Sequence, residues 1–187
     1  MSVSTSNLVL GPAKLYTGAF GAVEPLDSAV NTAPAASAWS DVGGTMGGLT
    51  LEINQTYTEL DVDQVVDSVG RRLTKRDMTA TTSLAEPTLA NLNYILNGGT
   101  SASGAGWSSY DPLITTSATQ PNYIALLTDG WAPGAGFNRR LILRKCLSTA
   151  KTDFLYAKDK QQVFAVTWNV HYVSSSITPF HIVDQTS

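Results

Sequence analysis

Alternation of apolar and polar residues is the feature that most limits how this chain of 187 residues can fold. Within residues 161–173, every second side chain from Phe164 to Tyr172 is apolar, which is the period of a β-strand with one buried face. Comparable patterns, bounded by Gly and Pro, predict further strands at 13–16, 49–57, 72–84, 122–128, 137–149 and 177–183. The length suits one domain, so the sequence predicts a mainly β fold, a β-sandwich or barrel.

One segment departs from the period of two. Residues 87–97 carry leucines at helical spacing: Leu89, Leu92 and Leu96. Pro87 suits a first helical position and Gly98 a C-terminal cap, so one α-helix is expected to flank the sheet. The segments 18–38 and 98–121, rich in small and polar residues, are predicted as long loops of a single domain that covers the whole chain.

Charges are sorted into two opposed blocks between residues 59 and 76. The acidic block is Glu59, Asp61, Asp63 and Asp67. The basic block is Arg71, Arg72, Lys75 and Arg76. Aliphatic residues lie among them: Leu60, Val62, Val65, Val66 and Val69. A solvated hairpin tip would explain the charges, but exposed aliphatic side chains promote aggregation unless a partner covers them. We therefore predict a protruding arm at about 55–76, with an acidic and a basic face, whose eight charged residues mediate self-association.

Composition excludes several classes of protein. Charged residues make up only 14%, well below the roughly 25% of an average soluble domain, which suggests that much of the surface becomes covered. The net charge of -3 lacks the basic excess of a free nucleic-acid binder. A single cysteine permits no internal disulfide, and the N-terminal sequence resembles neither a signal peptide nor a membrane anchor.

Few residues are available for catalysis or metal binding. Cys146 and His171 could form a nucleophile and base, but Cys146 lies in an alternating strand, where a lone cysteine is usually a buried apolar residue. The aspartates of the acidic block approach the spacing of a calcium loop, yet Val65 and Val66 stand where a ligand and a glycine are required. No enzymatic activity, metal or cofactor is expected.

Several motifs occur in a distinctive order along the chain. They are LGPAKLYTG at 10–18, WSDVGGTMGGLTL at 39–51, TELDVDQ at 58–64 and SLAEPTLANLNYIL at 83–96. Their order and spacing resemble those of the major tail tube proteins of long-tailed, non-contractile phages. Beyond about residue 98 the strands are compatible with that family, without a sharp motif.

The resemblance implies an assembly and a set of partners. Members of this family form hexameric rings that stack into a hollow tube, with inner strands of all subunits joined into one β-barrel around the channel. It implies a tape measure protein in the lumen during assembly, and tail terminator and distal tail proteins as further partners. Genome DNA then passes through the channel without specific binding. The expected location is the tail of the virion, and the host cytoplasm during assembly, with no membrane anchor.

A channel that lets DNA slide should be lined by short, polar, uncharged side chains, because Lys and Arg hold phosphates. Residues of this kind share one face of two predicted strands: Thr79, Thr81, Ser83, Thr167 and Asn169. We predict that they line the channel.

Two alternatives stay open at the level of sequence. One is the tube protein of a related injection machine, such as a type VI secretion system or a gene transfer agent. The other is a monomeric β-sandwich module that binds carbohydrate, with Trp107, Tyr110 and Trp131 lining a groove.

Overall fold

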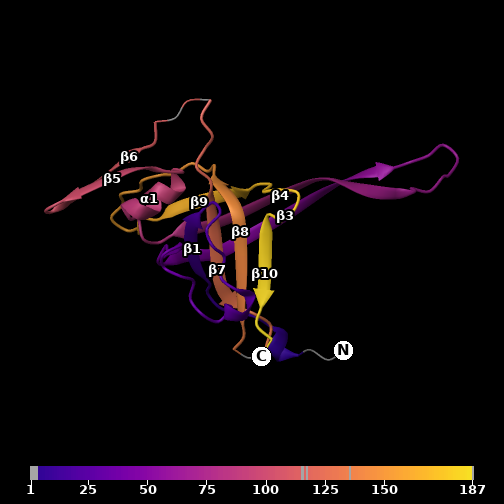
Figure 1. The fold of residues 1–187 in the computed structure, drawn as a ribbon, viewed down its shortest axis with the longest axis horizontal. Helices are drawn as coiled ribbons and strands as arrows, with labels where there is room; N and C mark the ends of the chain where they lie inside the picture. Colours follow the sequence, from indigo (N-terminus) through magenta and orange to yellow (C-terminus); the bar gives the residue numbers. More distant parts are fainter. Residues whose placement is uncertain (1–3, 115, 117, 135, 187) are drawn as a thin grey trace.

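The computed structural model describes residues 4–114, 116, 118–134 and 136–186, and it is mainly β with one α-helix (Figure 1). The predicted class, a β-sandwich or barrel with one flanking helix, is confirmed. The main sheet has eight strands and is antiparallel throughout. Its order is β2 (Trp39–Asp41), β1 (Lys14–Ala19), β7 (Ile124–Trp131), β8 (Asn138–Ser148), β9 (Phe164–Val170), β4 (Gly70–Leu84) and β3 (Thr45–Leu60), with β10 (Phe180–Asp184) beside β8.

Strand β8 divides the sheet into two parts. One of its edges pairs with β7, and the other is shared between two strands. Its first half pairs with β10, where Phe180 lies opposite Leu143, and its end pairs with β9, where Val170 lies opposite Cys146. The two parts enclose the larger hydrophobic core, so residues far apart in the sequence pack together there.

The larger core joins side chains from both parts of the sheet and from the helix. Its members include Leu15, Leu126, Leu143, Ala80, Leu84, Phe164, Val166, Trp168, Leu92 and Ile95. Strand β9 alternates buried and less buried positions, as its period of two predicts. Tyr172 was predicted to point inward with that face, but it lies beyond the end of β9 and is exposed.

A smaller core lies on the other face of β1, β7 and β8. It is formed by Tyr16, Trp39, Ala125, Leu127 and Ile142. The segment 20–38 covers this face, and the indole Nε1 of Trp39 donates a hydrogen bond to the carbonyl of Val23 at 2.9 Å. Burial on both faces explains why β7 begins as an almost unbroken apolar run.

Arg140 of β8 fastens the covering segment to the sheet. Its side chain is 2% exposed and donates to both carboxylate oxygens of Asp129, at 2.6 and 2.8 Å. It also donates to the carbonyls of Ala29 and Thr32. Within the described residues, the hydrogen bonds of this buried side chain link β8 either to β7 or to the segment 20–38.

Helix α1 (Leu89–Ile95) is shorter than the predicted 87–97. Thr88 is its N-cap and accepts a hydrogen bond from the amide of Asn91, so Pro87 precedes the cap and does not occupy the first helical position. Asn91, Leu92 and Ile95 form the buried face, whereas Leu89 and Leu96 are exposed. Within the described residues, no helix is long and apolar enough to cross a membrane.

The prediction of a loop over 98–121 is wrong for its first half. Strands β5 (Gly99–Gly104) and β6 (Trp107–Pro112) form a separate two-stranded sheet that projects from the body (Figure 1). The side chains of this hairpin are exposed or half-buried on both strands, so its sequence carries no apolar period to reveal it. Residues 115 and 117 of the predicted loop lie outside the described residues.

The role of Arg140 can be tested against its neighbour in the chain. Arg140→Ala should lower the free energy of unfolding by about 3–5 kcal/mol, because it leaves Asp129 and two carbonyls unpaired. Arg139→Ala removes an exposed ion pair with Asp184 and should cost at most about 1 kcal/mol. Urea denaturation of both variants measures the difference, and equal losses would contradict the fastening role.

Candidate functional site

Strands β3 and β4 extend far beyond the rest of the sheet. Thr79 is the outermost residue of β4 that pairs with β9, and beyond it the two strands pair only with each other, out to Leu60 opposite Gly70. At about 3.3 Å per residue, residues 53–60 alone reach roughly 25 Å. Figure 1 shows this ribbon projecting away from the body. We call residues 52–77 the arm and residues 61–69 its tip.

A bulge at the root of β3 sets where the arm leaves the body. Met46 lies opposite Ser83 and Thr50 opposite Thr81, so β3 carries extra residues between these pairs. Gly47 and Gly48 fill this position with φ of 78° and 77°, a conformation that residues with a side chain rarely adopt. Thr82 donates from Oγ1 to the carbonyl of Gly48 at 2.7 Å, which holds the bulge against β4. Bulges bend and twist a strand, so the double glycine directs the arm.

The arm carries an apolar stripe that continues the core-facing side of the sheet. On the body, this side holds Met78, which is 5% exposed. The stripe runs outward from there through Ile53, opposite Met78, and resumes beyond the Gln55–Arg76 pair on the same side with Tyr57 and Leu73, which lie opposite each other. Ile53, Tyr57 and Leu73 are 41%, 51% and 39% exposed, respectively. The stripe is therefore a continuation of the core face that the subunit itself leaves uncovered.

The eight charged residues predicted for self-association all lie on the arm, but they do not form an acidic and a basic face. The acids gather at and near the tip, and the bases lie along β4 behind it. Cross-strand pairing puts Arg71 and Arg76 on one side of the ribbon and Arg72 and Lys75 on the other, so charge is separated along the length of the arm. The alternation of strand side chains causes this, because neighbouring bases must point to opposite sides.

Most of these charges have no ion-pair partner among the residues that the structure describes. Arg71 approaches Glu59 at 3.7 Å, and Lys75 pairs with Asp77 at 2.8 Å, both in exposed positions. Among the described residues, the other charges of the two blocks make no ion pair, and exposed pairs contribute only about 0–1 kcal/mol each. The charges consequently do little for the stability of the arm itself.

The five residues predicted to line a channel share one face of β4 and β9. Thr79 lies opposite Asn169 and Thr81 opposite Thr167, with the two hydroxyl oxygens of the latter pair 3.3 Å apart. Ser83 continues the row on β4, opposite Ala165. The helix packs on the other side of the sheet, where its Leu92 and Ile95 meet the core. The structure thus gathers these five side chains into one polar, uncharged surface that α1 does not cover.

The candidate nucleophile and base do not face each other. Cys146 points into the larger core, where burial raises the pKa of its thiol to about 12. Val170 is the residue opposite Cys146, so the next residue, His171, points to the other side of the sheet. Burial, with a smaller effect of Lys145, lowers the pKa of His171. This arrangement gives no hydrogen bond that could activate the thiol.

The structure brings no metal or carbohydrate site together from the residues considered. In the part of the chain that is described, no group of three or more His, Cys, Asp or Glu side chains is placed to hold a metal ion. Trp131 lines a hollow beside Lys14 and Asn138, whereas Trp107 and Tyr110 belong to the separate β5–β6 hairpin. The three aromatic residues therefore do not line one groove.

No protein-family model matches this chain, and a search of curated proteins found no similar sequence.

The exposure of the stripe can be tested with the cross-strand pair Ile53 and Met78. Ile53→Thr should lower the free energy of unfolding of the monomer by no more than about 1 kcal/mol, because the residue is already 41% exposed. Met78→Thr should lower it by more than about 2 kcal/mol, because it opens the core and buries a hydroxyl. Urea denaturation at a concentration that keeps the protein monomeric compares the two. A large loss for Ile53→Thr would show that the arm is packed within its own subunit.

Proposed function

We propose that this protein is the structural subunit of a phage tail tube, which assembles into stacked hexameric rings around a channel for DNA. The observation that carries the proposal is the arm, whose apolar stripe extends the core face beyond the reach of the subunit's own core. An exposed apolar stripe on a projecting arm favours a partner, because exposed apolar area on a stable protein often marks an interface. The resemblance to tail tube proteins supplies the partner, which is another copy of the chain.

Unpaired strand edges support the same proposal. In the described part of the chain, β3 pairs with β4 on one edge and with no strand on the other, along its whole length of 16 residues. A long unpaired edge is a template for adding another strand. In a closed ring, each subunit can pair its edge with the next, so that no edge stays free. The tail tube architecture implied by the resemblance closes its sheet in this way.

The polar face of β4 and β9 suits the wall of a DNA channel. Threonine, serine and asparagine side chains line it. Toward the arm, the first charged residue on this face is Glu52, which lies beside Thr79 on β3. Neutral or acidic groups lack the positive charge through which Lys and Arg bind phosphates strongly, so DNA can slide past them. The tape measure protein would occupy this lumen until the DNA is released.

The expected energies assign different roles to the apolar stripe and to the charges of the arm. Apolar burial contributes about 25 cal/mol per Å² removed from water, so the covered stripe would supply most of the affinity between subunits. The unpaired charges of the arm would mainly fix orientation and discourage wrong contacts. Each contact recurs around every ring and along the tube, so weak pairs suffice.

Charge reversal on the arm tests the proposal. The purified protein, once concentrated, should form rings or tubes in negative-stain microscopy. Reversing Arg71, Arg72, Lys75 and Arg76 to Glu should abolish these particles while the unfolding midpoint stays within a few degrees, because the four side chains are exposed.

A matched control reverses bases on the body. Lys151→Glu, Lys158→Glu and Lys160→Glu change exposed residues outside the arm, and the triple variant should still assemble. A wild-type protein that stays monomeric at every concentration and binds a glycan saturably would overturn the proposal in favour of a carbohydrate-binding module.

A further inference from the structure

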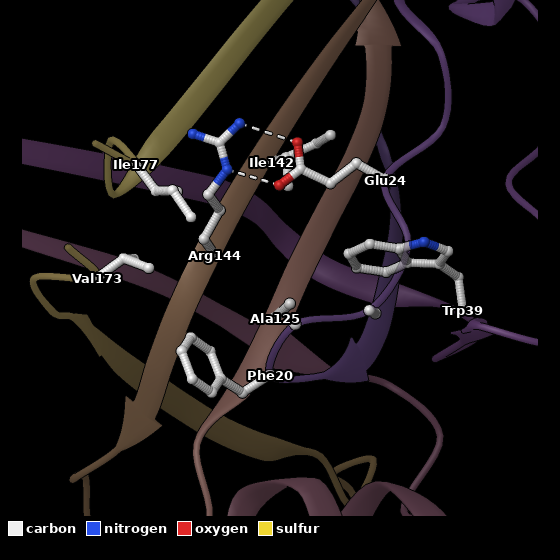
Figure 2. A pocket seen from close by; sticks show the side chains of 10 residues that line it. Phe20, Glu24, Trp39, Ala125, Ile142, Arg144, Val173 and Ile177 are labelled. Atoms are coloured by element: carbon white, nitrogen blue, oxygen red, sulfur yellow. Dashed lines mark hydrogen bonds and ion pairs between the residues drawn. The ribbon is translucent and has the colours of Figure 1, made fainter. Parts of the chain in front are cut away.

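A pocket on the body has the chemistry of a receptor for an apolar side chain next to a carboxylate. It has a volume of about 260 Å³ and lies between the segment 20–24, β7, β8 and the stretch before β10 (Figure 2). Its walls are mostly apolar and include Phe20, Trp39, Ile142, Val173 and Ile177. We call it the Phe20 pocket.

A bulge in β8 turns two consecutive cations to the side of this pocket. Leu126 lies opposite Leu143 and Ile124 opposite Cys146, so β8 carries one more residue than β7 between these pairs. Leu143 and Cys146 both point into the larger core, which leaves Arg144 and Lys145 together on the other side. A regular strand would have sent them to opposite faces.

The two cations differ in whether their charge is compensated. Arg144 donates to both carboxylate oxygens of Glu24, at 2.5 and 2.9 Å, and also to Thr178, so its charge is neutralised (Figure 2). Lys145 has no carboxylate partner among the described residues. Its ammonium lies 4.4 Å from the ring centre of Tyr123 and 5.5 Å from that of Phe20. An uncompensated cation therefore stands beside an open apolar pocket.

The arm tip has the complementary chemistry. Val66 is fully exposed, and Asp67, the next residue, makes no ion pair among the described residues. The N-terminal segment also exposes apolar residues, Leu8 and Leu10, but it has no acid beside them. Because the tip stands well beyond the body, only another copy of the chain can bring the tip and the pocket together (Figure 1).

We propose that the Phe20 pocket of one subunit receives the arm tip of another, with Val66 in the apolar cavity and the carboxylate of Asp67 beside the ammonium of Lys145. This inference rests on the proposed self-assembly and names the surface that the arm binds. The contact joins two different surfaces, so it is heterologous and propagates from copy to copy. Glu24 compensates the charge of Arg144, which leaves Lys145 to select an acidic tip.

Disulfide trapping tests this contact directly. The variant Val66→Cys/Ile177→Cys should form a ladder of covalently linked subunits when the assembled protein is oxidised, because each link joins the tip of one copy to the pocket of the next. Each single variant has only one new thiol and should give at most dimers. Cys146 does not interfere, because it is fully buried and its thiol pKa is raised to about 12. Val66→Cys/Leu10→Cys is the control, since Leu10 lies outside the pocket and is more accessible than Ile177, 98% against 47% exposed.

A charge exchange gives a second, independent readout. Lys145→Glu should raise the concentration needed for assembly by about tenfold or more, and adding Asp67→Lys to it should restore assembly. Unfolding midpoints show that both variants are folded. The pocket contact is overturned if the protein assembles, yields no more ladder than the Leu10 control and is unaffected by Lys145→Glu. That result leaves the proposed function standing. A wild-type protein that never assembles overturns both.

Discussion

The pairing of β3 with β4 beyond the edge of the core is the constraint on which the other features depend. Backbone hydrogen bonds can carry a two-stranded ribbon into solvent, but they cannot cover its side chains. An isolated hairpin is only marginally stable in water. One face of the ribbon is covered by the core at Met78. Farther out, the same face is exposed to water at Ile53, Tyr57 and Leu73 unless another molecule covers it. The proposed self-assembly would cover the stripe and supply partners for the free strand edges.

The tip and the stripe need not bind the same neighbour. The stripe lies along the shaft of the arm, beside the unpaired edge of β3, and suits side-by-side contact with an adjacent subunit. The tip lies farthest from the body, where an apolar residue and a carboxylate suit the Phe20 pocket of a more distant copy. Two arginines of β8 hold the segment 20–38: Arg140 bonds Ala29 and Thr32, and Arg144 bonds Glu24, which lines the pocket. In the proposed assembly, one subunit would present a ligand and a receptor at separate places, as growth into a tube requires.

The sequence predicted the elements whose side chains alternate between a buried and an exposed face. Strands β9 and β4 were readable because one face of each meets the core, and the aliphatic residues among the charges of 59–76 indicated an exposed arm. The β5–β6 hairpin escaped prediction because neither of its faces is buried. The Phe20 pocket could not be foreseen, because the β8 bulge that gathers Arg144 and Lys145 depends on the register with β7. The predicted acidic and basic faces do not form, because strand side chains alternate and the four bases therefore point to both sides of the ribbon.

Hydrogen exchange on the free and the assembled protein tests most directly whether other copies complete the arm. In the monomer, the amides on the outer edges of residues 52–77 have no described strand partner and should exchange rapidly. In assembled particles the same amides should be protected by a factor of about 100 or more, while core strands such as β7 change little. Equal exchange of the arm in both states would contradict the account, because the arm would then be in water whether or not the subunits are joined.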